Sequence, residues 1–407
     1  MTKRKMIVVF LILLIVTNAI AFGLGSFTTL QLGNSIVVSK TDYEVLKKLQ
    51  QDNEKLVTVR KAIDELYLRE VDDEALREGQ IRGMVAALDD PYSVYMSKSE
   101  YEEFNMETEG EYGGIGIIVT PGDDNLITVV SPIEDTPGER AGIKTGDKII
   151  RVEGVDYFAE TMDEAVSRMR GEPDTDVTIT ILRIKDGESE TFDVTLTREI
   201  IKLVSVKSEL LEGDIGYIRL TSFDVPTASD FLNHLSRLKM QGIKGIIIDV
   251  RNNPGGLMNV STDIADELLG EATIVYTKDK NGKKDYIYSD DKHTDLPLVI
   301  LVNEGSASAS EILAGAIQDN GRGILIGTTT FGKGVVQRLR DLPDGSGIKL
   351  TVSEYFTPAD KNIHGIGIEP DIIVELSEEA EGIGMDYLEQ DNQLQRAIEE
   401  LKKIIQE

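Results

Sequence analysis

The spacing of apolar positions divides the chain into helical and strand-like regions. Between residues 41 and 107 apolar side chains recur at helical spacing, and Leu49, Leu56 and Ile63 stand seven residues apart. Asp52 interrupts the neighbouring seam of this repeat. The pattern predicts a helical region with a partial heptad, which fits either a short dimerising helix or an ordinary helix packed on its own domain.

From about residue 109 the pattern changes to short apolar runs, which are typical of strands. These runs predict a compact β-rich module over residues 108–198, with one helix over 161–170. The strands expected in this module cover residues 116–120, 126–130, 148–152, 177–183 and 191–196.

Strands and helices alternate over residues 199–377, which predicts an α/β domain. The unbroken run Ile246-Ile247-Ile248 indicates a strand buried on both faces. Strands are expected at 215–220, 245–250, 273–276, 298–302, 324–327, 335–340 and 349–355, and helices at 226–240, 257–269 and 309–320. Residues 378–407 form a further region, predicted to be helical.

The first forty residues indicate where the chain resides. Lys3, Arg4 and Lys5 precede an apolar run over 6–22, and no further charge occurs before Lys40. A basic flank before such a run orients the remainder of a chain away from the cytoplasm. We therefore expect residues 1–40 to be a signal peptide or a transmembrane anchor. The protein would then be extracytoplasmic, either held at the cell membrane by this helix or secreted after its cleavage.

Composition narrows the possible chemistry. The 407 residues suggest two to three domains, and 43 basic against 72 acidic residues give a net charge of −29, which disfavours nucleic acid as a partner. The chain has no cysteine, which excludes disulfides, thiolate nucleophiles and cysteine-ligated metals. It has only three histidines, and we expect neither a metal nor another cofactor.

A glycine-rich loop opens the β-rich module. Gly113, Gly114, Ile115 and Gly116 stand just before a predicted strand, where successive backbone N–H groups can accept a peptide carboxylate. Arg168, late on the predicted helix, is a candidate peptide contact, although it fits a solvated helix end equally well. The ordered sequence from residue 113 to 198, with its Ala-Gly-Ile-Lys-Thr-Gly-Asp element, resembles a PDZ domain of the kind inserted in bacterial proteases.

The serine-rich segment before the helix predicted at 309–320 has two interpretations, and Lys333 decides between them. Ser308 and Glu311 have the spacing of a helix capping box, which requires no catalytic role. Lys333, however, stands between two glycines after an apolar strand, and desolvation would lower the pKa of its amine. A neutral lysine can take the proton of a serine hydroxyl, and Gln337, four residues on, is placed to orient the amine. A histidine base for Ser308 is a less favoured alternative.

The same lysine also fits a phosphate-binding loop. Gly327 and Gly332-Lys333 match its Gly-x-x-x-x-Gly-Lys pattern. The next residue is Gly334 rather than serine or threonine, and a strand is predicted where that motif requires a helix. Nucleotide binding is therefore disfavoured.

Three motifs together resemble one known family. Arg-Asn-Asn-Pro-Gly-Gly, Gly-Ser-Ala-Ser-Ala-Ser-Glu and Thr-Phe-Gly-Lys-Gly-x-x-Gln occur in this order after the PDZ-like module. They resemble the C-terminal processing (tail-specific) serine peptidases, family S41, over about residues 60–375. The resemblance implies an α/β and α+β multidomain fold: a crotonase/ClpP-like core with an inserted PDZ domain, helical terminal segments and one N-terminal transmembrane or signal helix.

The resemblance also implies roles for individual residues. Ser308 would be the nucleophile, with Lys333 as its base and Gln337 as the third catalytic residue. The backbone N–H of Ala309, with that of Gly255 or Gly256, would form the oxyanion hole.

The expected function is that of a serine endopeptidase. It would cut protein substrates near their C-termini, after the PDZ domain binds the substrate tail and switches the enzyme on. A homodimer formed through residues 41–107 and 385–405 is a further expectation. The rival interpretation is a non-catalytic PDZ scaffold outside the cytoplasm, which would bind peptides without cleaving them.

Overall fold

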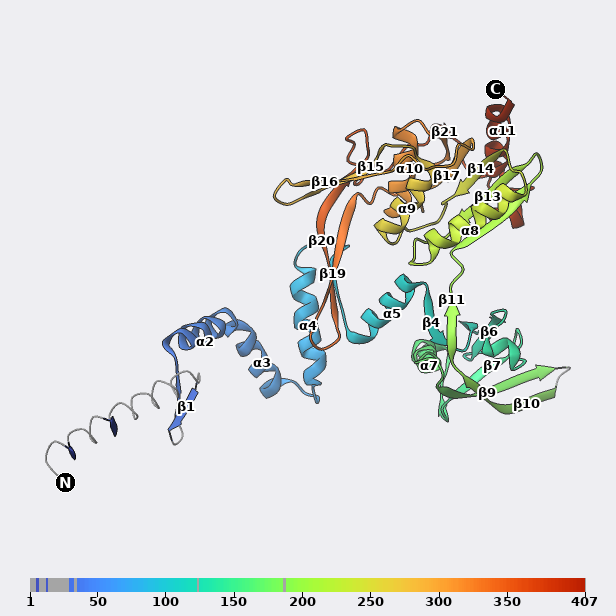
Figure 1. Cartoon of the computed structure of the whole chain (residues 1–407). Helices are drawn as coiled ribbons and strands as arrows, with labels where there is room; N and C mark the ends of the chain where they lie inside the picture. The colour runs from blue at the N-terminus through green and yellow to red at the C-terminus, as the bar shows by residue number, and fades with distance from the viewer. Residues whose placement is uncertain are drawn as a thin grey trace. The chain divides into compact units, whose positions relative to one another are not determined.

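The computed structural model describes residues 5–6, 12–13, 29–32, 35–122, 124–185 and 188–406 (Figure 1). The predicted N-terminal anchor helix lies largely outside these residues. Within the described part, no helix has both the length and the apolar character needed to cross a membrane. The region 1–40 also contributes a short antiparallel hairpin of β1 (Thr29–Leu32) and β2 (Ser35–Val38).

The chain divides into two units, residues 1–80 and 81–407. In the first unit, α2 (Lys40–Asp52) and α3 (Glu54–Leu66) contain no buried residue. The heptad positions Leu49 and Leu56 are 53% and 42% exposed. The helical region breaks at Asn53, so that Leu49 and Leu56 lie on different helices, and both side chains are exposed.

The single helical region predicted over 41–107 is in fact interrupted. α4 (Asp73–Ala86) ends shortly before Asp89, whose positive φ of 53° and the following Asp90-Pro91 turn the chain. A short strand, β3 (Val94–Met96), then precedes α5 (Lys98–Glu109), which begins with a capping box from Ser97.

The predicted β-rich module is a sheet of order β10-β9-β7-β6-β5, with β8 paired to β7. Alternate residues such as Ile127, Val129, Ile149, Ile179 and Ile181 are fully buried beneath α7. The bounds are β5 (Ile117–Pro121), β6 (Ile127–Pro132), α6 (Pro137–Arg140), β7 (Lys148–Val152), β8 (Val155–Asp156), η1 (Ala159–Thr161), α7 (Met162–Met169), β9 (Asp176–Lys185) and β10 (Glu188–Thr197).

Two short strands join this module to the rest of its unit. β4 (Glu111–Gly114) leads in and β11 (Glu199–Lys202) leads out, and the two pair antiparallel. The module is therefore an insertion whose entry and exit lie side by side.

The α/β region is built on a sheet of order β12-β13-β14-β17-β18-β21, parallel from β13 onward. Its strands are β12 (Val206–Leu211), β13 (Ile215–Leu220), β14 (Gly245–Asp249), β17 (Leu298–Val302), β18 (Ile324–Gly327) and β21 (Ile372–Ile373). The prediction that β14 is buried on both faces is confirmed, because all five of its residues are buried.

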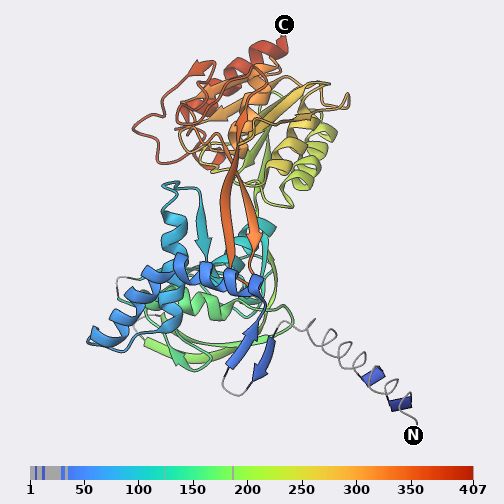
Figure 2. The ribbon, with the colours of Figure 1, turned by 90° about the vertical axis from the view of Figure 1, so that its left-hand side faces the viewer.

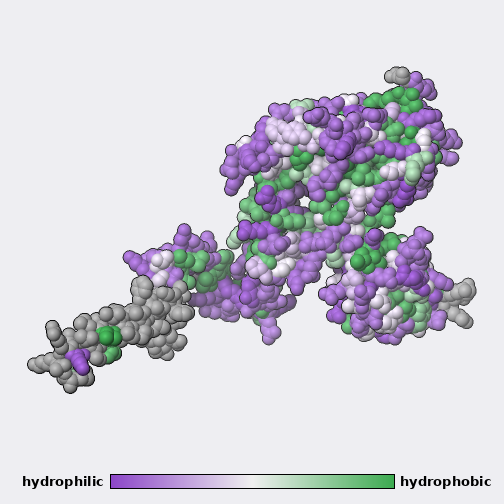
Figure 3. All heavy atoms as spheres, in the orientation of Figure 1, coloured by the Kyte–Doolittle hydropathy of each residue, from purple (hydrophilic) through white to green (hydrophobic). Residues whose placement is uncertain are grey.

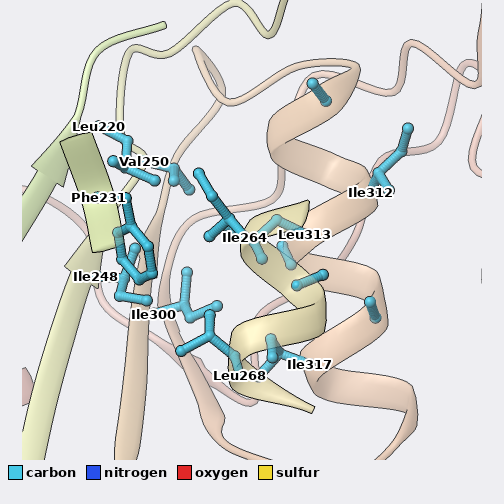
Figure 4. Packing of buried hydrophobic residues seen from close by; sticks show 14 of the residues in the cluster. Leu220, Phe231, Ile248, Val250, Ile264, Leu268, Ile300, Ile312, Leu313 and Ile317 are labelled. Atoms are coloured by element: carbon cyan, nitrogen blue, oxygen red, sulfur yellow. The ribbon is translucent and has the colours of Figure 1, made fainter. Parts of the chain in front are cut away.

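Helices cover both faces of this sheet. Ile248 and Ile300 pack against α8 (Thr227–Met240), α9 (Met258–Leu268) and α10 (Ala309–Asp319), as Figure 4 shows for Ile264, Leu313 and Ile317. Ile247 and Val299 point the other way, into a cluster with α11 (Asn392–Gln406). Because successive side chains of a strand point to opposite faces of the sheet, the same strands contribute apolar side chains to the core on each face.

A second, antiparallel sheet has the order β16-β15-β20-β19, with β3 also paired to β20. Its strands are β15 (Thr273–Asp279), β16 (Lys284–Tyr288), β19 (Val335–Asp341) and β20 (Gly347–Phe356). Figure 2 shows the long orange hairpin of β19 and β20 extending from the α/β region. The C-terminal tail, predicted to be helical from 385, has only a 3-10 turn at Met385–Tyr387 before α11 begins.

Candidate active site

Three loops that follow neighbouring parallel strands carry the three sequence motifs. β14, β17 and β18 are adjacent in the sheet, and their carboxyl ends lie at one edge. The loop after β14 contains Gly255 and Gly256, the loop after β17 ends at Ser308, and the loop after β18 contains Lys333. Segments far apart in the sequence thereby meet at the start of α10.

Ser308 adopts a backbone conformation that serine rarely takes. Its φ is 54° and its ψ −111°, at the N-cap of α10. Non-glycine residues at positive φ are uncommon. Such a strained conformation persists only where contacts with the surrounding structure hold the backbone in place. Several contacts hold the backbone of Ser308. Its N–H donates to Glu311 Oε2 at 2.8 Å, and its carbonyl accepts the hydroxyl of Tyr355 at 3.1 Å and the N–H groups of Glu311 and Ile312.

The carboxylate of Glu311 connects the serine loop to the lysine loop. Its side chain is fully buried. Oε2 accepts the N–H of Ser308 at 2.8 Å and that of Lys333 at 2.9 Å. Oε1 accepts the hydroxyl of Thr330 at 2.6 Å and the N–H of Gly332 at 2.7 Å. The capping-box spacing revealed only the contact to Ser308, because the other three donors come from a distant segment.

Lys333 is a half-buried amine with few charged neighbours. Burial lowers its pKa, and the charge of Lys349 lowers it further, while Glu311 and Asp90 act in the opposite direction. Nζ lies 5.0 Å from the centroid of the Tyr92 ring. No hydrogen bond joins it to Ser308 Oγ within the described residues.

Ser308, Lys333 and Gln337 line one cavity of about 580 Å³. Its remaining wall is largely apolar, with side chains such as Leu257 and Ile312. The amide of Gln337 donates to the carbonyl of Val335 at 3.3 Å, so it is not hydrogen-bonded to the lysine in this arrangement. The structure thus brings the three predicted catalytic residues to one cavity without linking their side chains directly.

The two glycines of the β14 loop differ in what their N–H groups do. The N–H of Gly255 donates to Asn253 Oδ1 at 2.9 Å and is therefore occupied. Among the described residues, no partner is found for the N–H groups of Gly256 and Ala309. A Cβ on Gly255 would lie 2.9 Å from Ser308 Cβ, and one on Gly256 would lie 2.4 Å from the carbonyl oxygen of Phe223. Both glycines also have positive φ, so a larger residue at either position would have both a steric clash and an unfavourable backbone conformation.

The inserted module has a groove of about 290 Å³ between β5 and α7, lined by both apolar and charged side chains. Ile115 and Gly116 of the predicted ligand loop line it, together with Ile117, Met162 and Val166. Such a groove beside a strand suits an extended peptide.

The other residues predicted to bind peptide lie elsewhere. Gly113 and Gly114 belong to β4 and pair with β11. A Cβ on Gly113 would lie 2.0 Å from the carbonyl oxygen of Gly171, so the close approach of two backbones requires glycine there. Arg168 faces a neighbouring cavity between α5 and α7. Arg170 lines the groove and pairs with Glu103 of α5 at 3.1 Å.

No cluster of three or more His, Asp or Glu side chains in the described part of the chain is arranged to hold a metal. The phosphate-loop interpretation fails on geometry, because Lys333 is followed by the strand β19 and not by a helix.

Comparison with known proteins identifies the relatives of this arrangement. A carboxy-terminal-processing protease of Bartonella bacilliformis is 42% identical over 317 residues, which are 76% of this chain and 72% of the relative. A carboxyl-terminal-processing protease of Synechocystis is 41% identical over 301 residues, which are 72% of this chain and 70% of the relative. The chain belongs to peptidase family S41. The family model, "Peptidase family S41", matches residues 214–374 and so includes all three motif loops.

Further matches agree with this membership. The carboxy-terminal processing protease CtpA of Bacillus subtilis is 35% identical over 394 residues, covering 96% of this chain and 81% of the relative. A PDZ domain model matches residues 128–183, within the inserted module, and the model "Activating protease CtpB N-terminal domain" matches residues 14–100. The expected S41 fold with a PDZ domain is confirmed, and the chain is a serine peptidase of the C-terminal processing type. The scaffold alternative is therefore not favoured.

Proposed function

We propose that this S41 peptidase cleaves its substrates with Ser308 as nucleophile and Lys333 as general base. The observation that carries the proposal is their common cavity, in which burial lowers the pKa of the Lys333 amine. A neutral amine accepts a proton, whereas the ammonium of an ordinary lysine does not. The amine moves from the Tyr92 ring to the serine hydroxyl when substrate fills the cavity, and the Gln337 amide orients it there.

The reaction proceeds in two halves. Lys333 takes the proton of Ser308, and Oγ attacks the scissile carbonyl carbon. The N–H groups of Gly256 and Ala309 hold the resulting oxyanion, and each such donor contributes about 3 kcal/mol to the transition state. The tetrahedral intermediate collapses as the C–N bond breaks, and the ammonium of Lys333 returns its proton to the leaving nitrogen. Water, deprotonated by the same amine, then hydrolyses the acyl-enzyme and regenerates Ser308.

Tail recognition belongs to the groove of the PDZ domain. The apolar side chains in its lining, such as Ile117 and Val166, favour a substrate that ends in apolar residues, added as a strand beside β5. The ion pair between Arg170 and Glu103 links the groove to α5, and the next residue of α5, Phe104, lines the catalytic cavity. We propose that the PDZ domain controls cleavage in this way. A bound peptide disturbs the ion pair, α5 shifts as a result, and the wall of the catalytic cavity shifts with it.

The same proposal includes location and assembly. The basic and apolar N-terminal sequence supports an extracytoplasmic enzyme that is anchored in the membrane or released from it. The exposed heptad positions of α2 and α3 support a homodimer.

Peptide cleavage tests the proposed function. The full chain should cut a peptide with an apolar C-terminal tail, as read by mass spectrometry of the products, and Ser308→Ala should reduce the rate to background. Lys333→Arg should be nearly as damaging, because arginine stays protonated. Lys244→Arg, an exposed lysine paired with Asp214, is the matched control and should retain full activity. Cleavage that persists in Ser308→Ala would overturn the proposal.

A further inference from the structure

The catalytic cavity contains a second lysine, Lys349, to which the reaction gives no role. It lies on β20 and lines the same cavity as Ser308, Lys333 and Gln337. Its position is fixed from both sides, since Lys349 pairs with Leu339 of β19 and with Val94 of β3. Leu339 and Gln337 are two residues apart on β19 and also line the cavity. Alternation along a strand places such residues on one face of the hairpin.

Lys349 has no carboxylate partner among the described residues. Its Nζ lies 4.8 Å from the centroid of the Phe104 ring and forms no ion pair. Glu107 lines the same cavity without pairing to it. Lys333, by contrast, has Glu311 and Asp90 as opposite charges in its surroundings. Burial alone lowers the pKa of Lys349, with no opposing contribution from a nearby anion.

Lys349 is a half-buried cation that forms no ion pair with any described residue, although it lines a cavity in a strongly acidic chain. With 72 acidic against 43 basic residues, carboxylates are abundant, and lysines of the α/β region such as Lys239, Lys244 and Lys361 pair with one, whereas Lys349 does not. Partial burial of an ammonium without a partner costs free energy, which an incoming anion would offset. The net charge of −29 repels anionic substrates, so a bound carboxylate would need a local cation of this kind.

We propose that Lys349 forms a carboxylate-binding subsite beside the scissile bond. The inference rests on the proposed function and adds a specificity determinant to it. Two sources supply the same chemistry: an Asp or Glu side chain near the cleaved bond, or the free C-terminal carboxylate of the substrate. The ammonium lies over the Phe104 ring, a contact that helps to hold the cation in the cavity and leaves its charge without a bound anion.

Matched peptides test the subsite and separate the two sources. One series places Glu, or Gln as its neutral match, at each of the positions flanking the cleaved bond. A second series compares a free C-terminus with an amidated one. In the wild-type chain, kcat/KM should be about 10-fold or more higher for the carboxylate form at one position, because only that form makes a charge-assisted hydrogen bond to the ammonium. The series in which the preference occurs identifies the source.

Variants assign the preference to Lys349. Lys349→Met keeps the length of the side chain but removes its charge, so it should abolish the preference, chiefly through a higher KM for the carboxylate form. Lys349→Arg should retain it. Lys244→Met is the matched control and should behave as wild type.

The outcomes are distinguishable. Equal cleavage of both members of every pair by the wild-type chain would overturn the subsite while leaving the proposed function intact. An equal loss for both members in Lys349→Met would also overturn it, because Lys349 would then act only through the basicity of Lys333. Cleavage of no peptide at all would overturn the proposed function, and the subsite with it.

Discussion

Glu311 is the residue on which the geometry of the catalytic loops depends. Its two oxygens accept four hydrogen bonds, and two of them come from the backbone N–H groups of Ser308 and Lys333. A buried carboxylate is costly unless its hydrogen-bonding capacity is satisfied, and here it is. The same contacts that satisfy the charge therefore keep Ser308 in its strained conformation and hold the lysine loop beside it.

Replacing this carboxylate with an amide tests that positioning. Glu311→Gln retains one acceptor oxygen, but its NH₂ group would face N–H donors. We expect kcat/KM to fall by about 10–100-fold and the free energy of unfolding by about 1–3 kcal/mol. Activity assays and urea titrations measure the two effects. Glu378→Gln, at an exposed site, should change neither, and wild-type kcat/KM in Glu311→Gln would contradict the positioning role.

At the scale of elements, the C-terminal segment is attached to the loop that carries Gly255 and Gly256. Arg251, at the start of that loop, is fully buried and donates to Asp249 and to Asp391, which stands just before α11. Gln393 accepts a further bond from the same guanidinium. Burial opposes the charge of Asp391, but the hydrogen bonds and charge of Arg251 outweigh it and lower the pKa of the carboxyl.

Removing one member of this hydrogen-bonded network should lower the free energy of unfolding substantially. Asp391→Ala leaves the buried Arg251 guanidinium short of a counter-charge, so we expect a loss of about 3–5 kcal/mol in the free energy of unfolding, read by chemical denaturation. Glu389→Gln, nearby and exposed, should stay within about 0.5 kcal/mol of wild type. A loss below about 1 kcal/mol in Asp391→Ala would show that the network is not structurally important.

The same network has a definite pH dependence. The folded chain holds the proton of Asp391 more weakly than the unfolded chain does, because its pKa is lowered on folding. Its contribution to stability is therefore present above the ordinary aspartate value of about 3.9 and is lost as the pH falls through the lower folded value.

Strands that form a regular apolar run in the sequence were predictable. Short strands that form only because a strand distant in the sequence pairs with them were not. The strands Lys148–Val152, Ile215–Leu220, Leu298–Val302 and Ile324–Gly327 agree with their predicted bounds because each is a short apolar run between turn residues. β3, β4, β11 and β21 have two to four residues and exist because a remote strand pairs with them.

The candidate site likewise has features that were predictable from the sequence and features that were not. Ser308, Lys333 and Gln337 stand in recognisable motifs, and the structure brings them to one cavity. The four contacts of Glu311 and the presence of Lys349 in that cavity depend on which loops and strands become neighbours. Local sequence patterns carry no information about those neighbours, so neither feature was expected.

At the scale of the whole molecule, charge and exposed apolar surface act in opposite directions. The predominantly hydrophilic surface in Figure 3 agrees with a net charge of −29, which favours solubility. Against this background, the exposed Val45, Leu49, Leu56 and Val59 of the first unit are conspicuous. Val45 and Leu49 lie about one turn apart on α2, as do Leu56 and Val59 on α3, and exposed apolar side chains at this spacing are typical of an interface between helices.

Assembly through these helices can be measured directly. The full chain should sediment as a dimer at equilibrium, and the double variant Leu49→Glu/Leu56→Glu should sediment as a monomer, because charges at the seam are not tolerated. Glu44→Gln, elsewhere on α2, serves as the control and should remain dimeric. A wild-type chain that is monomeric at all concentrations would contradict the predicted homodimer.

The pH dependence of acylation tests most directly whether a neutral lysine activates Ser308. A fluorophosphonate probe should label Ser308 in the full chain, and mass spectrometry gives the rate of labelling at each pH. Because the base must be unprotonated and burial lowers the pKa of Lys333, the rate should rise with pH through a midpoint below the ordinary lysine value of about 10.4. Lys333→Arg should show no such rise. A midpoint at or above the ordinary value, or labelling of Lys333→Arg at the wild-type rate, would contradict the account.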